Sequence, residues 1–198
     1  MKILRATLRL LALSVLMLTF YLLLIVGLAL LWRSSAARLR WRNFIARSWG
    51  RSVGRLAGLT THVEGTPPAP PFLLVSNHLG YIDIILFSSL LGCVFVAKKE
   101  IEDWPVVGRM CRAAQTIFVD RENRRDVVRV NRLIEQALTA GKGVVLFPEG
   151  TSTKGETVAP FNAALLAYAA QTGFPVAYAA VSYRTRADEA PAHLSVCW

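Results

Sequence analysis

A run of 23 residues without a charged side chain, residues 10–32, most constrains what this chain of 198 residues can fold into. A helix of that length spans about 34 Å, and the hydrocarbon core of a bilayer is roughly 30 Å thick. A secretory signal peptide has a shorter apolar region of about 7–15 residues and a small-residue cleavage site. The run is longer than that and Arg33 follows it directly, so we expect an uncleaved transmembrane helix.

The excess positive charge of the chain lies in its N-terminal third. The net charge is +10, and residues 1–63 hold ten Lys or Arg and no acid, whereas residues 64–198 hold thirteen of each sign. Three cations precede the apolar run and seven follow it up to Arg55. Because the more positive flank of a membrane helix stays in the cytoplasm, we expect a single-pass anchor in the inner cell membrane with the rest of the chain on the cytoplasmic side. This placement favours anionic lipids as partners and argues against nucleic acid.

Residues 36–59 predict a second helix that is amphipathic and basic. Aromatic and aliphatic side chains recur there at helical spacing, and arginines occupy much of the remaining surface without any acid. Such a helix suits the headgroup plane of a bilayer, although a solvated basic face on a soluble domain would give the same pattern. We expect the membrane surface, and assign residues 1–63 to a membrane anchor with a basic interfacial helix. Residues 64–198 form a separate domain.

Short apolar strands alternate with helices after a proline-rich segment at residues 65–71. The expected strands are residues 72–76, 94–97, 116–119, 144–147 and 175–183, and the expected helices are residues 81–91, 109–114, 123–140 and 164–171. This alternation predicts an α/β fold, with a mostly parallel central sheet flanked by helices. The three cysteines form no C-x-x-C pair, so we expect neither a disulfide framework nor a bound metal.

Three polar clusters follow predicted strands, at the sheet edge where open α/β folds place their sites. In the first, His78 leaves a strand and Asp83 falls in the first turn of the next helix. A carboxylate there can accept the imidazole N–H, fix its tautomer and support the protonated ring, which suits deprotonation of an alcohol. Alone, the spacing also fits a helix-capping loop with an incidental histidine.

The other two clusters offer groups for an anionic or hydroxylic substrate. Arg121 follows the third predicted strand, where its guanidinium could fork onto a phosphate or pair with a neighbouring acid. Glu149, Gly150 and Thr151 follow the fourth predicted strand, where a tight turn exposes N–H groups and hydroxyls. Each of these patterns is also compatible with an ordinary surface turn.

Taken together, the clusters resemble the glycerolipid acyltransferase superfamily, which includes the 1-acylglycerol-3-phosphate acyltransferases. The matching segments are residues 77–83 (NHLGYID), 117–121 (IFVDR), 147–151 (FPEGT) and 174–177 (FPVA), with residues 96–100 and 104–108 also similar. The resemblance covers residues 72–183. One departure is Gln115, where the family usually has a glycine. The apolar, strand-like residues 194–198 are an unusual end for a domain, so we expect the sequence to be C-terminally truncated.

The resemblance implies transfer of a fatty acyl group from acyl-CoA or acyl-carrier protein, as co-substrate and with no bound cofactor, to a lysolipid hydroxyl. The expected acceptor is 1-acylglycerol-3-phosphate, which would give phosphatidic acid in phospholipid biosynthesis. The implied catalytic residues are His78 and Asp83, and the implied substrate-binding residues are Arg121, Glu149, Gly150, Thr151 and Lys99. Three alternatives remain: another acceptor such as a lyso-ornithine lipid, a lipid hydrolase that uses water, and a non-catalytic membrane lipid-binding protein.

Overall fold

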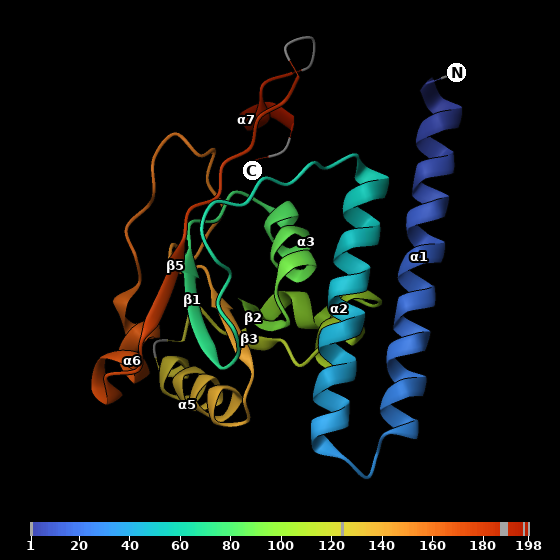
Figure 1. Cartoon of the computed structure of the whole chain (residues 1–198). Coiled ribbons are helices and arrows are strands. Elements are labelled where there is room, and N and C mark those ends of the chain that lie inside the picture. The colour runs from blue at the N-terminus through green and yellow to red at the C-terminus, as the bar shows by residue number, and fades with distance from the viewer. Residues whose placement is uncertain (1, 124, 187–189, 196, 198) are drawn as a thin grey trace. The chain divides into compact units, whose positions relative to one another are not determined.

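The chain folds into two compact units, and the computed structural model describes residues 2–123, 125–186, 190–195 and 197. One unit comprises Met1–Pro67 and Ile85–Gly92, and the other comprises Pro68–Ile84 and Cys93–Trp198. Helix α3 (Tyr81–Leu90) therefore begins in the second unit and ends in the first. Figure 1 shows the chain, with most of its helices and strands labelled.

The first unit contains the two helices expected from the N-terminal sequence. Helix α1 (Lys2–Leu30) includes Leu4–Leu30, whose mean hydropathy of 2.6 and length would allow it to cross a membrane, a property that a signal sequence shares. Helix α2 (Ser35–Ala57) begins where the Ser34 hydroxyl accepts the Ala37 N–H at 3.2 Å. It ends at Gly58, whose φ of 76° is the left-handed geometry typical of helix C-termini.

Helices α1 and α2 pack against each other along their length. The indole N–H of Trp41 donates to the Leu23 carbonyl at 3.2 Å, and that of Trp49 lies 3.0 Å from the Met17 sulfur. Gly27 gives the first indole room, because a Cβ at that position would lie 2.0 Å from the Trp41 ring nitrogen. The short connection between the helices turns α2 back antiparallel to α1. These two tryptophans, expected at a lipid-facing surface, therefore contact α1.

The second unit is built on a five-stranded sheet in the order β3-β2-β4-β1-β5. The strands are β1 (Phe72–Ser76), β2 (Cys93–Lys98), β3 (Ile117–Val119), β4 (Gly143–Leu146) and β5 (Val176–Ala179). Every paired strand runs parallel to its neighbour, which confirms the predicted α/β class. All five carboxyl ends therefore lie along one edge of the sheet, and each of the predicted polar clusters follows one of them.

Helix α5 (Asp126–Thr139) covers β3 and β4 and builds the main core of this unit, with the 3₁₀ turn η2 (Ala163–Leu166) and α6 (Ala167–Thr172) beside it. Val130 and Ile134 of α5 are fully buried against Val144 of β4. The helix starts three residues later than predicted, because the Asp120 carboxylate accepts the N–H groups of Glu122 and Asn123 and holds those residues in a turn.

The remaining helices are short. A 3₁₀ turn, η1 (Lys99–Asp103), follows β2 and leads into α4 (Val107–Ala113). Gln115 follows α4 with a φ of 66°, a left-handed conformation that favours glycine. Its side-chain oxygen is buried without a hydrogen-bond partner among the described residues. Gln115, the residue that differs from the usual glycine of the acyltransferases that the sequence resembles, therefore adopts glycine-like backbone geometry.

The C-terminal part differs from the prediction in two places. Strand β5 ends at Ala179, and residues 180–183 continue without ladder pairing. The expected strand at residues 194–198 is wrong for its first part, because α7 (Ala192–Ser195) forms directly after Pro191, a residue favoured at helix starts. The Leu194 N–H donates to the Pro191 carbonyl at 2.9 Å. Val196 and Trp198 lie outside the described residues.

Asp126 should make the stability of the fold depend on pH in the acid range. Hydrogen bonds from Arg129 lower the pKa of Asp126 from 3.8 to about 2, and the Asp120 N–H contributes in the same direction. A carboxyl group with a lowered pKa stabilises the fold above about pH 4 and loses that contribution as the pH falls toward 2. We therefore compare the free energy of unfolding of the two proteins in urea. Between about pH 4 and pH 2, we expect it to fall by about 1 kcal/mol more for the wild-type chain than for Asp126→Asn, after allowing for solvent screening. Parallel pH profiles for the two proteins would contradict this assignment.

Candidate active site

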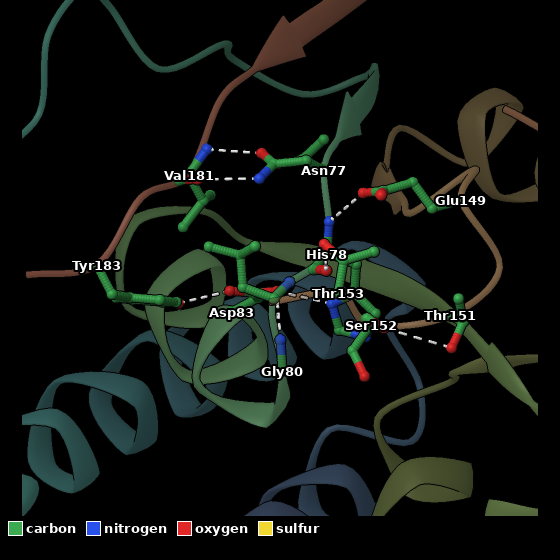
Figure 2. Close-up of polar contacts among 12 residues, drawn as sticks. Asn77, His78, Gly80, Asp83, Glu149, Thr151, Ser152, Thr153, Val181 and Tyr183 are labelled. Carbon is green, nitrogen blue, oxygen red and sulfur yellow. Dashed lines mark hydrogen bonds and ion pairs between the residues drawn. The ribbon is translucent and has the colours of Figure 1, made fainter. Parts of the chain in front are cut away.

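His78 and Asp83 lie together at the carboxyl end of β1. The imidazole Nδ1 lies 2.7 Å from Asp83 Oδ2, and the Asp83 side chain is fully buried whereas the His78 side chain is 20% exposed. The histidine ring stacks on Phe147, which follows β4, with ring centroids 4.2 Å apart. The two predicted residues therefore form a dyad (Figure 2), and the histidine side chain remains partly exposed.

The Asp83 carboxylate accepts hydrogen bonds from several directions. The backbone N–H groups of Leu79 and Gly80 donate to Oδ2 at 2.7 and 3.1 Å, and the Tyr183 hydroxyl donates to Oδ1 at 2.5 Å. The loop before α3 thus wraps around a carboxylate in that helix's own first turn, where the helix N-terminus favours negative charge. These donors satisfy a buried charge that would otherwise be costly.

This geometry determines what the histidine can do. With Nδ1–H donating to the carboxylate, Nε2 of a neutral ring is left as the proton acceptor. A proton taken up at Nε2 would produce an imidazolium stabilised by Asp83. Such a dyad is chemically capable of general-base catalysis through Nε2.

Glu149 braces the loop that carries His78. One carboxylate oxygen accepts the His78 backbone N–H at 2.6 Å, and the other accepts the Ala159 N–H at 2.7 Å. The Thr153 N–H donates to the His78 carbonyl at 2.9 Å, so the segment after β4 holds both backbone groups of the histidine. The structure thus gives Glu149 a supporting contact within the chain, beyond the predicted headgroup role.

We expect Glu149→Gln to weaken the fold around His78. An amide can keep only one of the two acceptor positions, and its NH₂ group would then face a backbone N–H. Leaving a fully buried donor without an acceptor costs about 1–3 kcal/mol of unfolding free energy, and for these partly buried N–H groups we expect a loss at the lower end of that range. Denaturant unfolding measures this loss against Glu156→Gln, which changes an exposed glutamate in the following loop. Equal effects of the two substitutions would contradict the bracing role.

Asn77 connects β1 to the segment after β5. Its amide forms two hydrogen bonds with the backbone of Val181, from Nδ2 to the carbonyl at 2.9 Å and from the Val181 N–H to Oδ1 at 2.7 Å. Because β1 and β5 are neighbours in register, these bonds continue the alignment of the two chains beyond the end of β5. They also lead the chain toward Tyr183.

Arg121 follows β3 and points to the turn after β4. Its guanidinium donates to the carbonyl of Gly150, whose φ of 73° makes the tight turn that presents this oxygen. Burial lowers the pKa of Arg121, and the nearby Glu100 carboxylate partly offsets the effect. The predicted headgroup residues Arg121 and Gly150 are therefore in direct contact. Thr151 is exposed, and its hydroxyl donates to the Ser152 carbonyl at 3.4 Å.

Lys99 lines a polar cavity. Its ammonium is 3.4 Å from Asp120, and both residues line this cavity of about 530 Å³ along β3 and α5. The residues lining this cavity do not include His78 or Asp83. Among the described residues, no group of three His, Cys, Asp or Glu side chains is arranged to hold a metal ion.

The sequence matches the acyltransferase family over residues 59–182, which is most of the second unit. The chain belongs to the acyltransferase family. Among curated relatives, it is 37% identical to a 1-acyl-sn-glycerol-3-phosphate acyltransferase of Neisseria meningitidis, over 72% of this chain and 56% of the relative. It is 33% identical to a lyso-ornithine lipid O-acyltransferase of Pseudomonas aeruginosa, over 72% of this chain and 55% of the relative. The chain thus spans about half the length of these relatives.

A solved structure shares the fold of this acyltransferase-family chain. The crystal structure of the 1-acyl-sn-glycerophosphate acyltransferase PlsC from Thermotoga maritima superposes with a TM-score of 0.60 and 23% sequence identity, covering 85% of this chain and 73% of that one. The parallel sheet with flanking helices and a long N-terminal apolar helix is therefore an architecture that this chain shares with a solved protein.

Sequence reasoning placed the dyad of this family member but missed its supports. The contacts that Asn77 and Tyr183 make with Val181 and Asp83 join residues about one hundred positions apart. Asn77 directly precedes His78 in the NHLGYID segment, so its position next to the histidine is a sequence signal for a role in the site. Tyr183 had no local pattern, because its placement depends on β5 lying beside β1.

Proposed function

We propose that this chain is a membrane-bound O-acyltransferase that moves a fatty acyl group from acyl-CoA or acyl-carrier protein to the hydroxyl of a lysolipid. The observation that carries the proposal is the 2.7 Å contact between His78 Nδ1 and the fully buried Asp83 carboxylate, which leaves Nε2 as a base. Family membership supplies the reaction class. A thioester donor and a lysolipid acceptor are the two substrates.

In the proposed reaction, the lysolipid hydroxyl gives its proton to His78 Nε2 while its oxygen attacks the thioester carbonyl carbon. The tetrahedral intermediate collapses as the carbon–sulfur bond breaks, and the leaving thiolate takes the proton from His78. An ester and a free thiol result. Asp83 does not touch the substrate; it fixes the ring and stabilises the imidazolium. General-base assistance of this kind contributes on the order of 10²–10⁴ in rate.

The proposed acceptor is 1-acylglycerol-3-phosphate, which would yield phosphatidic acid for phospholipid synthesis. Arg121 and Gly150 support an anionic headgroup site, since the guanidinium carries charge and the turn beside it exposes backbone and Thr151. Lys99 follows β2, the strand next to β3, and would supply a second cation if it exchanged Asp120 for the ligand. A phosphate monoester suits such a cationic site.

A lyso-ornithine lipid is the second candidate acceptor, because relatives with that name match about as well as those named for 1-acylglycerol-3-phosphate. The ornithine headgroup carries an amine as well as a carboxylate, so it would need an acid near the cations. The experiment is a competition assay with labelled acyl-CoA and equal amounts of both acceptors in mixed vesicles. Preferential labelling of phosphatidic acid supports the first acceptor, and preferential labelling of the ornithine lipid overturns it.

We further propose that α1 anchors the protein on the cytoplasmic face of the inner membrane. The exposed face of α2 carries Arg40, Arg47, Arg51 and Arg55, which suits contact with anionic headgroups. Because Trp49 contacts Met17, Arg47 and Arg51 lie beside the middle of α1. If α1 and α2 were inserted together, Arg47 and Arg51 would lie at the bilayer centre. Each would then raise the free energy of insertion by about 2.5–3.5 kcal/mol. A single pass therefore requires α2 to leave α1, whereas the packed pair favours a shallower position along the interface.

The depth of the anchor is testable with a cysteine introduced at Lys2 in a variant without the three native cysteines. Labelling of intact cells by a membrane-impermeant maleimide would place the N-terminus outside and support the single pass. Labelling only after lysis would support the packed pair on the cytoplasmic face. Recovery of the chain in the supernatant after alkaline extraction would overturn the anchor itself.

A further inference from the structure

We infer that Tyr183 is a positioning residue of the dyad, and that its hydroxyl sets the proton affinity of His78 by acting through Asp83. The inference rests on the proposed function for its kinetic consequence but not for its structural one. The geometry that carries it is the 2.5 Å hydrogen bond from the Tyr183 hydroxyl to Asp83 Oδ1, on the carboxylate oxygen opposite the one that faces His78 (Figure 2).

The two oxygens of Asp83 have different partners. Oδ2 accepts from the histidine ring and from the backbone N–H groups of Leu79 and Gly80. Tyr183 is the partner that the structure gives for Oδ1. Asp83 is fully buried, so bulk water has no direct access to this oxygen in the wild-type chain. The Tyr183 hydroxyl therefore modulates the electrostatic stabilisation that the Asp83 carboxylate gives to a protonated His78 ring.

The tyrosine is held as a permanent donor. Burial raises the pKa of Tyr183 well above its ordinary value, and the hydrogen bond and charge of Asp83 add to the increase. The phenol therefore stays protonated at every pH at which the dyad works. Cys197 is also near this carboxylate, and burial together with the charge of Asp83 raises the pKa of its thiol, which leaves it uncharged. Glu149 approaches the backbone N–H of His78.

The sign of the effect follows from the two protonation states of the dyad. The tyrosine hydrogen bond stabilises Asp83 most when its charge is uncompensated, that is, when His78 is neutral. When His78 is protonated, the imidazolium already neutralises the carboxylate, and the same bond contributes less. Removing the hydroxyl therefore destabilises the neutral-histidine state more than the protonated one. Loss of the hydroxyl should therefore favour the protonated ring, and the acid limb of the rate profile should move to higher pH.

The position of Tyr183 on the chain explains how this contact is secured. The residue lies four positions beyond the end of β5, and the double hydrogen bond between Asn77 and Val181 holds the intervening backbone beside β1. The same asparagine precedes His78 directly. One short segment of the loop after β1 therefore carries the base and also fixes the segment that delivers the tyrosine to Asp83.

The test compares Tyr183→Phe with Tyr168→Phe, a matched loss of a hydroxyl at a half-buried tyrosine that packs beside Phe174. The first readout is NMR titration of the His78 ring in detergent, assigned by its loss in His78→Gln. We expect the His78 midpoint to rise in Tyr183→Phe and to stay in place in Tyr168→Phe. Fluorotyrosine at position 183, a stronger donor, should lower the midpoint.

The second readout is acyl transfer as a function of pH. We expect kcat/KM of Tyr183→Phe to fall roughly 10-fold near neutral pH, with an acid limb displaced to higher pH and little change in KM. An unchanged His78 midpoint would overturn the inference, even if the variant were less stable. A wild-type chain without any transferase activity would instead defeat the proposed function, and the NMR titration would still decide the role of Tyr183.

Discussion

Replacement of His78 by alanine is expected to reduce acyl transfer by on the order of 10²–10⁴-fold or more, because no other group of the dyad can take the substrate proton. The loss should appear in kcat, measured as transfer of labelled acyl groups from acyl-CoA to a lysolipid in vesicles. The imidazole is only partly buried, so the alanine variant should fold and still bind the acceptor. Circular dichroism and vesicle-binding measurements check both points.

The control for this substitution is His62→Ala. The His62 side chain is 87% exposed and its nearest acid is Glu64, at 3.8 Å. Its loss should leave the rate unchanged within twofold, as is usual for an exposed side chain. Equal activity of His78→Ala and His62→Ala would contradict the role of His78. Release of free fatty acid by the wild-type chain in place of transfer would identify a hydrolase instead.

Asp83→Asn is expected to reduce kcat by a similar order, 10²–10⁴-fold, although it changes the shape of the side chain very little. The asparagine oxygen can still accept from Leu79 and Gly80, and its NH₂ group can donate to the Tyr183 oxygen. What disappears is the negative charge that supports the imidazolium. The variant should therefore remain folded and lose activity, in contrast to Asp103→Asn, which changes an exposed aspartate.

The double variant His78→Ala/Asp83→Asn distinguishes a catalytic unit from two separate effects. If Asp83 acts only through His78, the double variant should be no less active than His78→Ala alone, since groups that act as a unit are strongly non-additive. Multiplication of the two losses would contradict this account, and would indicate that Asp83 contributes to the reaction by another route.

The sequence predicted the sheet and the dyad because both are encoded by local patterns. The buried strand β1 and the amphipathic helix α5 have periodicities that need no tertiary information. His78 and Asp83 are five residues apart across a strand end and a helix start, so local geometry brings them within 2.7 Å of each other. Parallel strands then place Arg121 and Glu149 on the same edge.

The features that sequence could not predict depend on tertiary contacts or on competing local bonds. The contact of Trp49 with Met17 depends on how α2 folds back on α1, and the same aromatic pattern would also suit a lipid surface. The late start of α5 arises from Asp120, whose side chain competes with the helix for two N–H groups. The pairing of Glu149 is invisible in the sequence because its backbone partners, His78 and Ala159, come together only in the fold.

The central claim is tested most directly by incubating the purified wild-type chain with radiolabelled acyl-CoA and vesicles that contain 1-acylglycerol-3-phosphate, with His78→Ala in parallel. The account predicts label in phosphatidic acid, free thiol released in equal amount, and a yield of both products from the variant that is lower by on the order of 10²-fold or more. Absence of label from this acceptor and from every other lysolipid supplied, or equal labelling by the two proteins, would contradict it.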